Sequence, residues 1–140
     1  MNNEIHPFSP IYDEKAKILI LGTFPSVKSR ENEFYYGHPQ NRFWKVLSAV
    51  FSDTLPETIP EKRDFLLKHR IALWDVIQSC DITGSADSSI KKAVPNDIPG
   101  LLEKTQIKKV FCNGKKAHGL YLQHFKSISL PVEALPSTSP

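Results

Sequence analysis

The chain alternates between two hydrophobic patterns, one typical of buried strands and one typical of helices. Residues 17–21, Lys-Ile-Leu-Ile-Leu, form a short and nearly continuous apolar run, as in a strand buried on both faces of a parallel sheet. Residues 71–77 and 110–112 have the same character. Residues 128–135 predict a last strand, and Pro131 favours an edge position for it.

Helical spacing fills the segments between these strands. Residues 41–51 carry apolar side chains at the intervals of one helical face, so a helix is expected to begin near residues 39–41. Residues 61–69 predict a second helix, with acids first and basic residues last, the order that suits the helix dipole. Residues 98–104 and 117–125 predict two more. Alternating strands and helices favour an α/β fold with helices on both faces of a parallel sheet.

Length and composition narrow the class of protein. The chain has 140 residues, 40% hydrophobic and 24% charged, which excludes a disordered chain and favours one domain over residues 1–140. No stretch approaches the roughly 18 apolar residues that cross a bilayer, and the N-terminus lacks a secretion signal. We therefore expect a cytoplasmic protein without a membrane partner. Cys80 and Cys112 are too few for a four-cysteine zinc or iron–sulfur site.

The net charge of +3 is unevenly distributed along the chain. Residues 1–90 carry ten Lys/Arg and twelve Asp/Glu, whereas residues 91–126 carry eight lysines and only two acids. This basic segment has two interpretations. It is either a solvated, lysine-rich helix face or an electrostatic surface for a polyanion.

Small and polar residues gather where the predicted strands end. Ligands of open α/β sheets bind beyond the carboxyl ends of the strands, which directs attention to residues 22–40, 75–86, 113–116 and 136–140. The first of these segments is long for a loop in a compact domain, and such loops are often functional.

Two motifs occupy this first segment and the start of the helix. In Gly-Thr-Phe-Pro-Ser at residues 22–26, the glycine permits close backbone approach and the serine offers a hydroxyl. The motif either holds a phosphate or a flat base, or simply ends a strand. Asn41 either caps the helix or uses its amide to position a water or a base edge. His38 either bonds locally, or contacts a phosphate or carries a proton.

Together these motifs resemble a known family. The 22–26 motif, followed by His-Pro-Gln-Asn-Arg-Phe-Trp at residues 38–44, is similar to the uracil-DNA glycosylase superfamily, and particularly to its hypoxanthine-DNA glycosylase branch. Further segments similar to that branch lie at residues 72–76, 84–88, 94–97 and 113–117. The resemblance implies a three-layer α/β/α fold around a short, mainly parallel four-stranded sheet.

Two differences within the superfamily indicate the branch. Phe24 stands where the mismatch-specific members place a catalytic asparagine, whereas the hypoxanthine branch uses the asparagine that corresponds to Asn41. Residues 135–140, Leu-Pro-Ser-Thr-Ser-Pro, resemble the second superfamily motif but lack the histidine of uracil-specific members. Because the family continues into a further helix at this point, we expect this domain to lack its C-terminal helix.

The resemblance also implies roles for individual residues. Asn41 would orient the attacking water. The residues expected to bind the base are Gly22, Phe24, Pro25, Tyr36 and Asp75. Either Phe24 or Tyr36 would stack on the base, and Asp75 could instead be a helix cap or a turn acid. The residues expected to contact DNA are Ser26, His38, Lys115, Lys116, Ser137, Thr138 and Ser139.

The implied activity is hydrolysis of the N-glycosidic bond of a deaminated base in DNA, hypoxanthine first and uracil second, after the base is flipped out of the helix. The expected enzyme needs no metal or cofactor and acts as a monomer. A monofunctional enzyme is favoured because no lysine lies in residues 22–26, although Lys28 is close. Two alternatives remain. One is a non-catalytic protein that binds damaged or single-stranded DNA, and the other is a small nucleotide-binding α/β protein without affinity for DNA.

Overall fold

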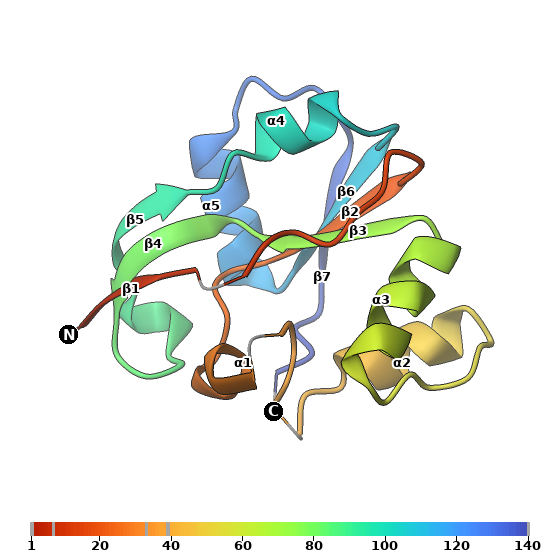
Figure 1. The fold of residues 1–140 in the computed structure, drawn as a ribbon. Coiled ribbons are helices and arrows are strands. Elements are labelled where there is room, and N and C mark those ends of the chain that lie inside the picture. Colours follow the sequence, from red (N-terminus) through yellow and green to blue (C-terminus); the bar gives the residue numbers. More distant parts are fainter. Residues whose placement is uncertain (1, 7, 33, 39, 140) are drawn as a thin grey trace.

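A four-stranded parallel sheet forms the centre of the protein (Figure 1). The structure is a computed structural model and describes residues 2–6, 8–32, 34–38 and 40–139. The strands lie in the order β3-β2-β6-β7, and each neighbouring pair is parallel. Their bounds are β2 (Ile18–Gly22), β3 (Ile71–Asp75), β6 (Lys109–Asn113) and β7 (Val132–Leu135). The predicted sheet is confirmed, and β7 lies at its edge, as Pro131 indicated, but this strand begins at Val132 and not at residue 128.

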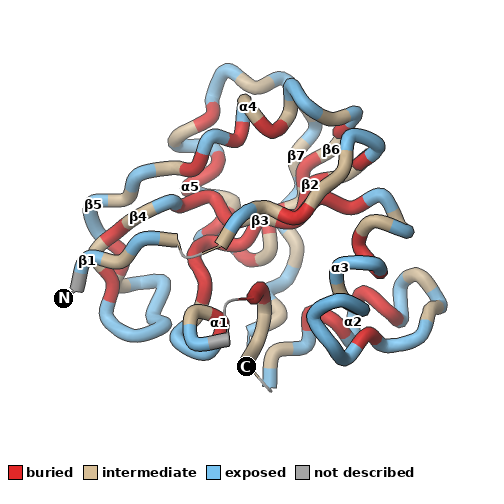
Figure 2. The backbone as a smooth tube through the Cα atoms, viewed as in Figure 1, coloured by how far each residue is buried: buried red, intermediate tan, exposed pale blue. Residues whose placement is uncertain are grey.

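Helices cover both faces of this sheet (Figure 1). They are α2 (Phe43–Val50) and α3 (Ile59–Lys68) on one face, and α4 (Ile98–Glu103) and α5 (Lys115–His124) on the other. Successive side chains of β2 point to opposite faces of the sheet. Leu19 and Leu21 pack with α4 and α5, whereas Ile20 packs with α2 and α3. Figure 2 shows that buried residues follow the central strands, while exposed residues lie along the outer helices and loops. This is the predicted three-layer arrangement.

A second, antiparallel sheet was not predicted. It has the strand order β1-β4-β5, with bounds β1 (Asn2–Ile5), β4 (Ile77–Ile82) and β5 (Lys91–Pro95). The strand expected over residues 71–77 is therefore wrong at its end, because β3 stops at Asp75 and the chain enters β4. A short helix, α1 (Val27–Asn32), lies in the first predicted loop, and a 3₁₀ turn (η1) covers Asp87–Ser89.

Two helix starts differ slightly from the predicted ones. Helix α3 begins at Ile59 because Thr58 and Glu61 form a capping box, in which each side chain accepts the backbone N–H of the other residue. Helix α2 begins at Phe43, with Arg42 at the N-cap, so Asn41 precedes the cap. The predicted start at residue 39 lies outside the described residues.

The strand register brings the carboxyl ends of the strands to one edge of the sheet. Gly22 pairs with Asp75 across β2 and β3, and Asn113 pairs with Leu135 across β6 and β7. Four sequence segments that are distant along the chain therefore leave the sheet side by side. No helix in the described part of the chain is long and apolar enough to cross a membrane.

Candidate active site

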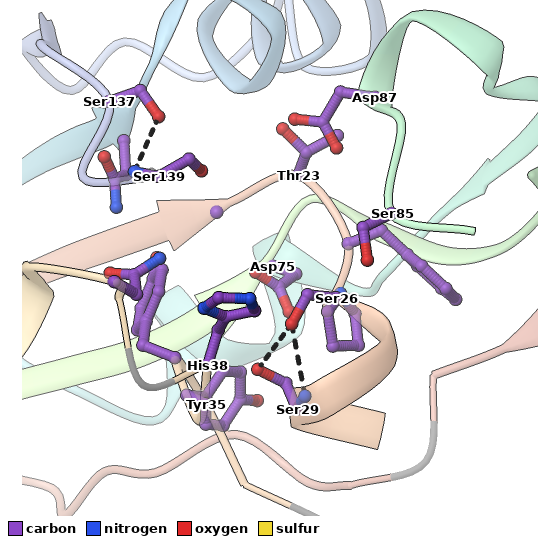
Figure 3. A pocket seen from close by; sticks show the side chains of 16 residues that line it. Thr23, Ser26, Ser29, Tyr35, His38, Asp75, Ser85, Asp87, Ser137 and Ser139 are labelled. Atoms are coloured by element: carbon purple, nitrogen blue, oxygen red, sulfur yellow. Dashed lines mark hydrogen bonds between the residues drawn. The ribbon is translucent and has the colours of Figure 1, made fainter. Parts of the chain in front are cut away.

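A cavity of about 310 Å³ lies at this carboxyl edge (Figure 3). Its volume is at the lower end of the range for small-molecule sites, roughly 300–1,000 Å³. Residues from all four predicted strand-end segments line it. The residues predicted from the sequence that line the cavity are Gly22, Phe24, Pro25, Ser26, Tyr36, His38, Asn41, Asp75, Ser137 and Ser139.

The end of β2 comes so close to β3 that residue 22 must be glycine. A Cβ atom at Gly22 would overlap Oδ1 of Asp75 and would stand 2.9 Å from the hydroxyl oxygen of Tyr36. The Asp75 residue is only 3% exposed. The Tyr36 hydroxyl is buried and makes no hydrogen bond of good geometry among the described residues, although the Asn113 side chain is near enough to lower its pKa. Burial, followed by the charge of Asp75, raises the pKa of Tyr36 well above its usual value, so the hydroxyl remains a donor.

Behind the cavity, Asp75 is held by a histidine that the sequence analysis did not single out. His6 Nε2 lies 2.7 Å from Asp75 Oδ2, and the two side chains are 2% and 5% exposed. The backbone of Asp75 is fixed as well, because Asn96 Nδ2 donates to its carbonyl oxygen at 2.9 Å. The carboxylate is therefore anchored on one oxygen, with its other oxygen beside Gly22 and Tyr36.

Asn41 belongs to a hydrogen-bond network that joins two ends of the site. Its Oδ1 accepts from the Phe43 backbone N–H at 2.9 Å and from the Thr138 hydroxyl at 2.8 Å. A backbone N–H can only donate, which fixes Oδ1 as the atom that faces it. Asn113 in turn donates from Nδ2 to the Thr138 hydroxyl at 3.0 Å and accepts the Thr138 N–H at 3.1 Å. The Asn41 oxygen is thus occupied, whereas its Nδ2 has no hydrogen-bond partner among the described residues.

The observed geometry has features of both interpretations of Asn41, the residue that caps the helix and the residue of the site. The side chain bonds the Phe43 N–H at the start of α2, but Arg42 occupies the N-cap position. The same amide lines the cavity. A local turn bond and a position in the site coexist because they use different atoms of the amide.

Serines organise the entry to α1. The Ser26 hydroxyl accepts the Ser29 N–H at 3.1 Å and donates to the Ser29 hydroxyl at 3.1 Å (Figure 3). The Ser29 hydroxyl also accepts the Gly37 N–H at 2.9 Å, which ties the 22–26 motif to the segment of Tyr36 and His38. His38 Nδ1 accepts the N–H of Gln40 at 3.1 Å, so Nε2 carries the proton of the neutral ring.

Tyr36 and Phe24, the two aromatic residues expected to stack on a base, both contact other side chains already. Tyr36 stacks on Phe43 with 3.9 Å between ring centroids and an interplanar angle of 13°. Its φ of 54° is left-handed, a strained conformation that is typical of functional sites. Phe24 has the Arg30 guanidinium over its ring at 5.6 Å and the edge-on ring of His6 at 6.0 Å.

Asp87 adds a second carboxylate to the cavity wall. Partial removal from water raises its pKa, a hydrogen bond with Thr23 opposes that change, and the charge of Asp75 reinforces it. Lys116, also near enough to act on Asp87, lowers the same pKa. This lysine lies on the exposed first turn of α5 beside Lys115.

Three predicted DNA-contacting residues do not line the cavity. Lys115 and Lys116 lie outside it on α5, and Thr138 turns its hydroxyl to Asn41 and Asn113. The lining residues that were not predicted are Thr23, Ser29, Tyr35, Ser85, Asp87 and Asn113. Asn113 could have been found, because it lies at the carboxyl end of a predicted strand, where ligands of such sheets bind. Ser85 and Asp87 lie in residues 84–88, one of the segments similar to the family. His6 carried no such signal. Within the described residues, no group of three or more His, Cys, Asp or Glu is placed to hold a metal ion.

Comparison with known proteins assigns the chain to a family. The model of the Uracil DNA glycosylase superfamily matches residues 9–140. The chain therefore belongs to the uracil DNA glycosylase superfamily, which confirms the resemblance of its motifs.

Individual relatives define the branch more closely. Proteins named hypoxanthine DNA glycosylase from Methanosarcina acetivorans and Methanosarcina barkeri are 38% and 34% identical over 134 residues, which cover 94% of this chain and 84% of each relative. A Methanosarcina acetivorans protein, described as a candidate uracil DNA glycosylase, has a solution NMR structure that matches with a TM-score of 0.83. It is 34% identical, and the match covers 94% of this chain and 83% of that one.

Proposed function

We propose that this protein is a monofunctional DNA glycosylase that hydrolyses the N-glycosidic bond of deaminated bases, hypoxanthine above all. The observation that carries the proposal is the position of Asn41, which lines the cavity of a superfamily member and whose amide nitrogen has no hydrogen-bond partner in the described part of the chain. Two relatives that align with 94% of the chain are named for hypoxanthine.

Base flipping brings the target base into the cavity. A base inside a duplex cannot be reached, and extruding it costs a few kcal/mol, less for a mismatched or damaged base. Deaminated bases pair poorly, so they open more readily than normal pairs. The small volume of the cavity, about 310 Å³, suits one flipped nucleotide rather than a longer segment.

In the proposed reaction, an Asn41 Nδ2–H group donates a hydrogen bond to the oxygen of a water and holds that water next to the C1′ carbon of the sugar. The water oxygen bonds to the C1′ carbon, and the bond between C1′ and the base nitrogen breaks, with its electron pair leaving on the base. Asp87, which lines the same cavity and has a raised pKa, accepts the proton of the water. The Asn41 amide can hold this position because Thr138 and Phe43 fix its oxygen.

Asp75 would recognise the chemical feature that deamination creates. Hypoxanthine has an N1–H beside a carbonyl, and uracil has an N3–H beside a carbonyl, whereas adenine and cytosine carry a nitrogen lone pair at those positions. An ionised carboxylate only accepts hydrogen bonds, so Asp75 Oδ1 would bind the N–H and repel the lone pair. The Tyr36 hydroxyl lies near the same point beside Gly22, makes no hydrogen bond of good geometry among the described residues, and would supply a donor for the adjoining carbonyl. Guanine and thymine also have this N–H, so their rejection would rest on pocket shape and on the stability of their pairs.

Lys115 and Lys116 would attract the DNA backbone. They occupy the first turn of α5, where positive charge opposes the helix dipole and where the helix has no acidic residue. This placement costs helix stability, which favours a role in binding anions. Ser137 and Ser139 line the cavity close to this end of the helix and would contact the flanking phosphates.

The role of the lysines has a matched control just beyond the other end of the same helix. Changing Lys115 and Lys116 to glutamine should weaken DNA binding and reduce the slope of log affinity against log salt by about 1–2, since each phosphate contact contributes about 0.9. Lys126→Gln removes an exposed lysine just beyond the other end of α5 and should leave the slope unchanged. Equal slopes in all three proteins would assign Lys115 and Lys116 to a solvated helix face.

A panel of lesions tests the activity itself. The protein is incubated with duplexes that contain deoxyinosine, deoxyuridine, deoxyxanthosine or a thymine mismatch, and abasic sites are then cleaved with alkali. We expect alkali-dependent cleavage, fastest at deoxyinosine. Cleavage without alkali would indicate a lyase, and tight binding without any base release would favour the non-catalytic alternative. The proposed enzyme acts in the cytoplasm as a monomer.

A further inference from the structure

The side chain of His6, the residue after β1, lies behind the cavity. His6 follows β1 directly, and its backbone N–H bonds the Gln78 carbonyl oxygen at 2.6 Å, which continues the pairing of β1 with β4. Its imidazole is 2% exposed and lies 2.7 Å from Asp75 Oδ2. His6 is not among the described residues that line the cavity, so it would reach a bound base only through Asp75.

The surroundings of His6 fix both its orientation and the position of its proton. The ring is packed against Phe8 at 4.7 Å and Tyr35 at 5.7 Å between centroids. The Phe8 N–H approaches His6 Nδ1 at 3.5 Å, a long hydrogen bond that makes Nδ1 the acceptor. In the neutral ring the proton then lies on Nε2, which donates to Asp75 Oδ2.

A carboxylate oxygen accepts hydrogen bonds, and a buried one is stabilised when a donor satisfies it. His6 Nε2 supplies that donor to Asp75 Oδ2. It also prevents rotation of the carboxylate, because Oδ2 is held while Oδ1 stays beside Gly22.

We propose that His6 is a positioning residue for base selection, which holds Asp75 as an oriented hydrogen-bond acceptor for the N–H of a deaminated base. The inference rests on the proposed function. It gives the N-terminal strand a role in specificity, and it assigns the discrimination between hypoxanthine and bases without that N–H to a pair of residues that are 69 positions apart.

The test compares two bases in the same duplex, hypoxanthine and unsubstituted purine, which has a lone pair at N1 and no N–H. Release of each base is measured with the enzyme in excess, and the readout is the ratio of the two rates. His6→Phe keeps an aromatic ring but removes the donor, whereas His6→Gln keeps an N–H at a similar reach. We expect the ratio to fall by about 10-fold or more in His6→Phe and to stay within about 3-fold of wild type in His6→Gln.

A purely structural role gives a different result. If His6 only supports the fold, both rates fall together and the ratio does not change, which overturns the inference. His6→Asn, whose shorter amide cannot reach Asp75, replaces His6→Phe if the larger ring prevents folding, as judged by thermal unfolding. In an Asp75→Asn background, His6→Phe should leave the ratio unchanged, and a further fall there would show that His6 acts by another route. A wild-type protein that releases no hypoxanthine overturns the proposed function as well, whereas an active enzyme with an unmoved ratio overturns this inference alone.

Discussion

Replacing Thr138 by valine distinguishes two roles for the C-terminal motif. The substitution removes one hydroxyl and nearly keeps the shape of the side chain. That hydroxyl donates to Asn41 Oδ1 at 2.8 Å and accepts from Asn113 Nδ2 at 3.0 Å. Without it, Asn41 keeps only the Phe43 N–H on its oxygen and can move. The family resemblance, in contrast, implies that Thr138 contacts a phosphate of the DNA.

The size of the effect follows from the bonds that are lost. One hydrogen bond contributes about 0.5–1.5 kcal/mol, so the loss of the Thr138 bond to Asn41 should slow base release by about 2- to 13-fold. The variant loses two side-chain bonds, and its free energy of unfolding should fall by about 1–3 kcal/mol. Thr138 is half-buried, so water replaces part of what is lost and the lower end is expected.

The assay separates chemistry from binding. Base release from a deoxyinosine duplex is measured with the enzyme in excess, and DNA affinity is measured by fluorescence anisotropy at several salt concentrations. Thr138→Val should reduce the rate and leave the affinity and its salt slope unchanged. Thr138→Ser keeps the hydroxyl and should retain the wild-type rate. An unchanged rate with weaker, less salt-dependent binding would refute the role in holding Asn41 and would support the phosphate contact.

Two further predictions concern the carboxylates. Gly22→Ala places a Cβ against Asp75 Oδ1, so it should cost about 1–3 kcal/mol of stability and abolish most base release. The control Gly119→Ala, in α5 with nothing within 4 Å of its Cβ, should stabilise the protein by about 0.5–1 kcal/mol; equal melting temperatures for both would contradict the close approach. Hydrogen bonds from His69 and, second, from Lys68 lower the pKa of Asp53 from 3.8 to about 2. The contribution of Asp53 to the stability of the protein is therefore complete above pH 4 and is lost as the pH falls toward 2. Asp53→Asn should therefore flatten the decline of the melting temperature in that window, and an unchanged profile would rule out the linkage.

The sequence predicts the central sheet because its strands are buried on both faces. Such strands are continuous apolar runs, as in residues 17–21, and they are recognisable without any tertiary information. The outer sheet gives no comparable signal. The segments Asn2–Ile5 and Lys91–Pro95 are rich in polar residues, and they form strands because β4 lies between them. Their pairing depends on long-range contacts that a local pattern cannot contain.

The cavity was predictable in outline for a similar reason. Strand ends and the resemblance placed Asn41, Asp75 and the 22–26 motif at one edge of the sheet, where the structure has them. Their partners were not predictable. Thr138 lies 97 residues from Asn41 and His6 lies 69 residues from Asp75, and each partner reaches the site from a segment whose path only the fold determines.

In the proposed mechanism, the protein releases hypoxanthine from DNA and Asn41 carries the chemistry. The most direct measurement is single-turnover release of hypoxanthine from a deoxyinosine duplex, made on the wild type and on Asn41→Ala, with the affinity for the same duplex measured alongside. We predict rapid release by the wild type, and loss of release in Asn41→Ala with DNA affinity within a few-fold of wild type. Turnover at the wild-type rate in Asn41→Ala, or no release by either protein, would contradict the account.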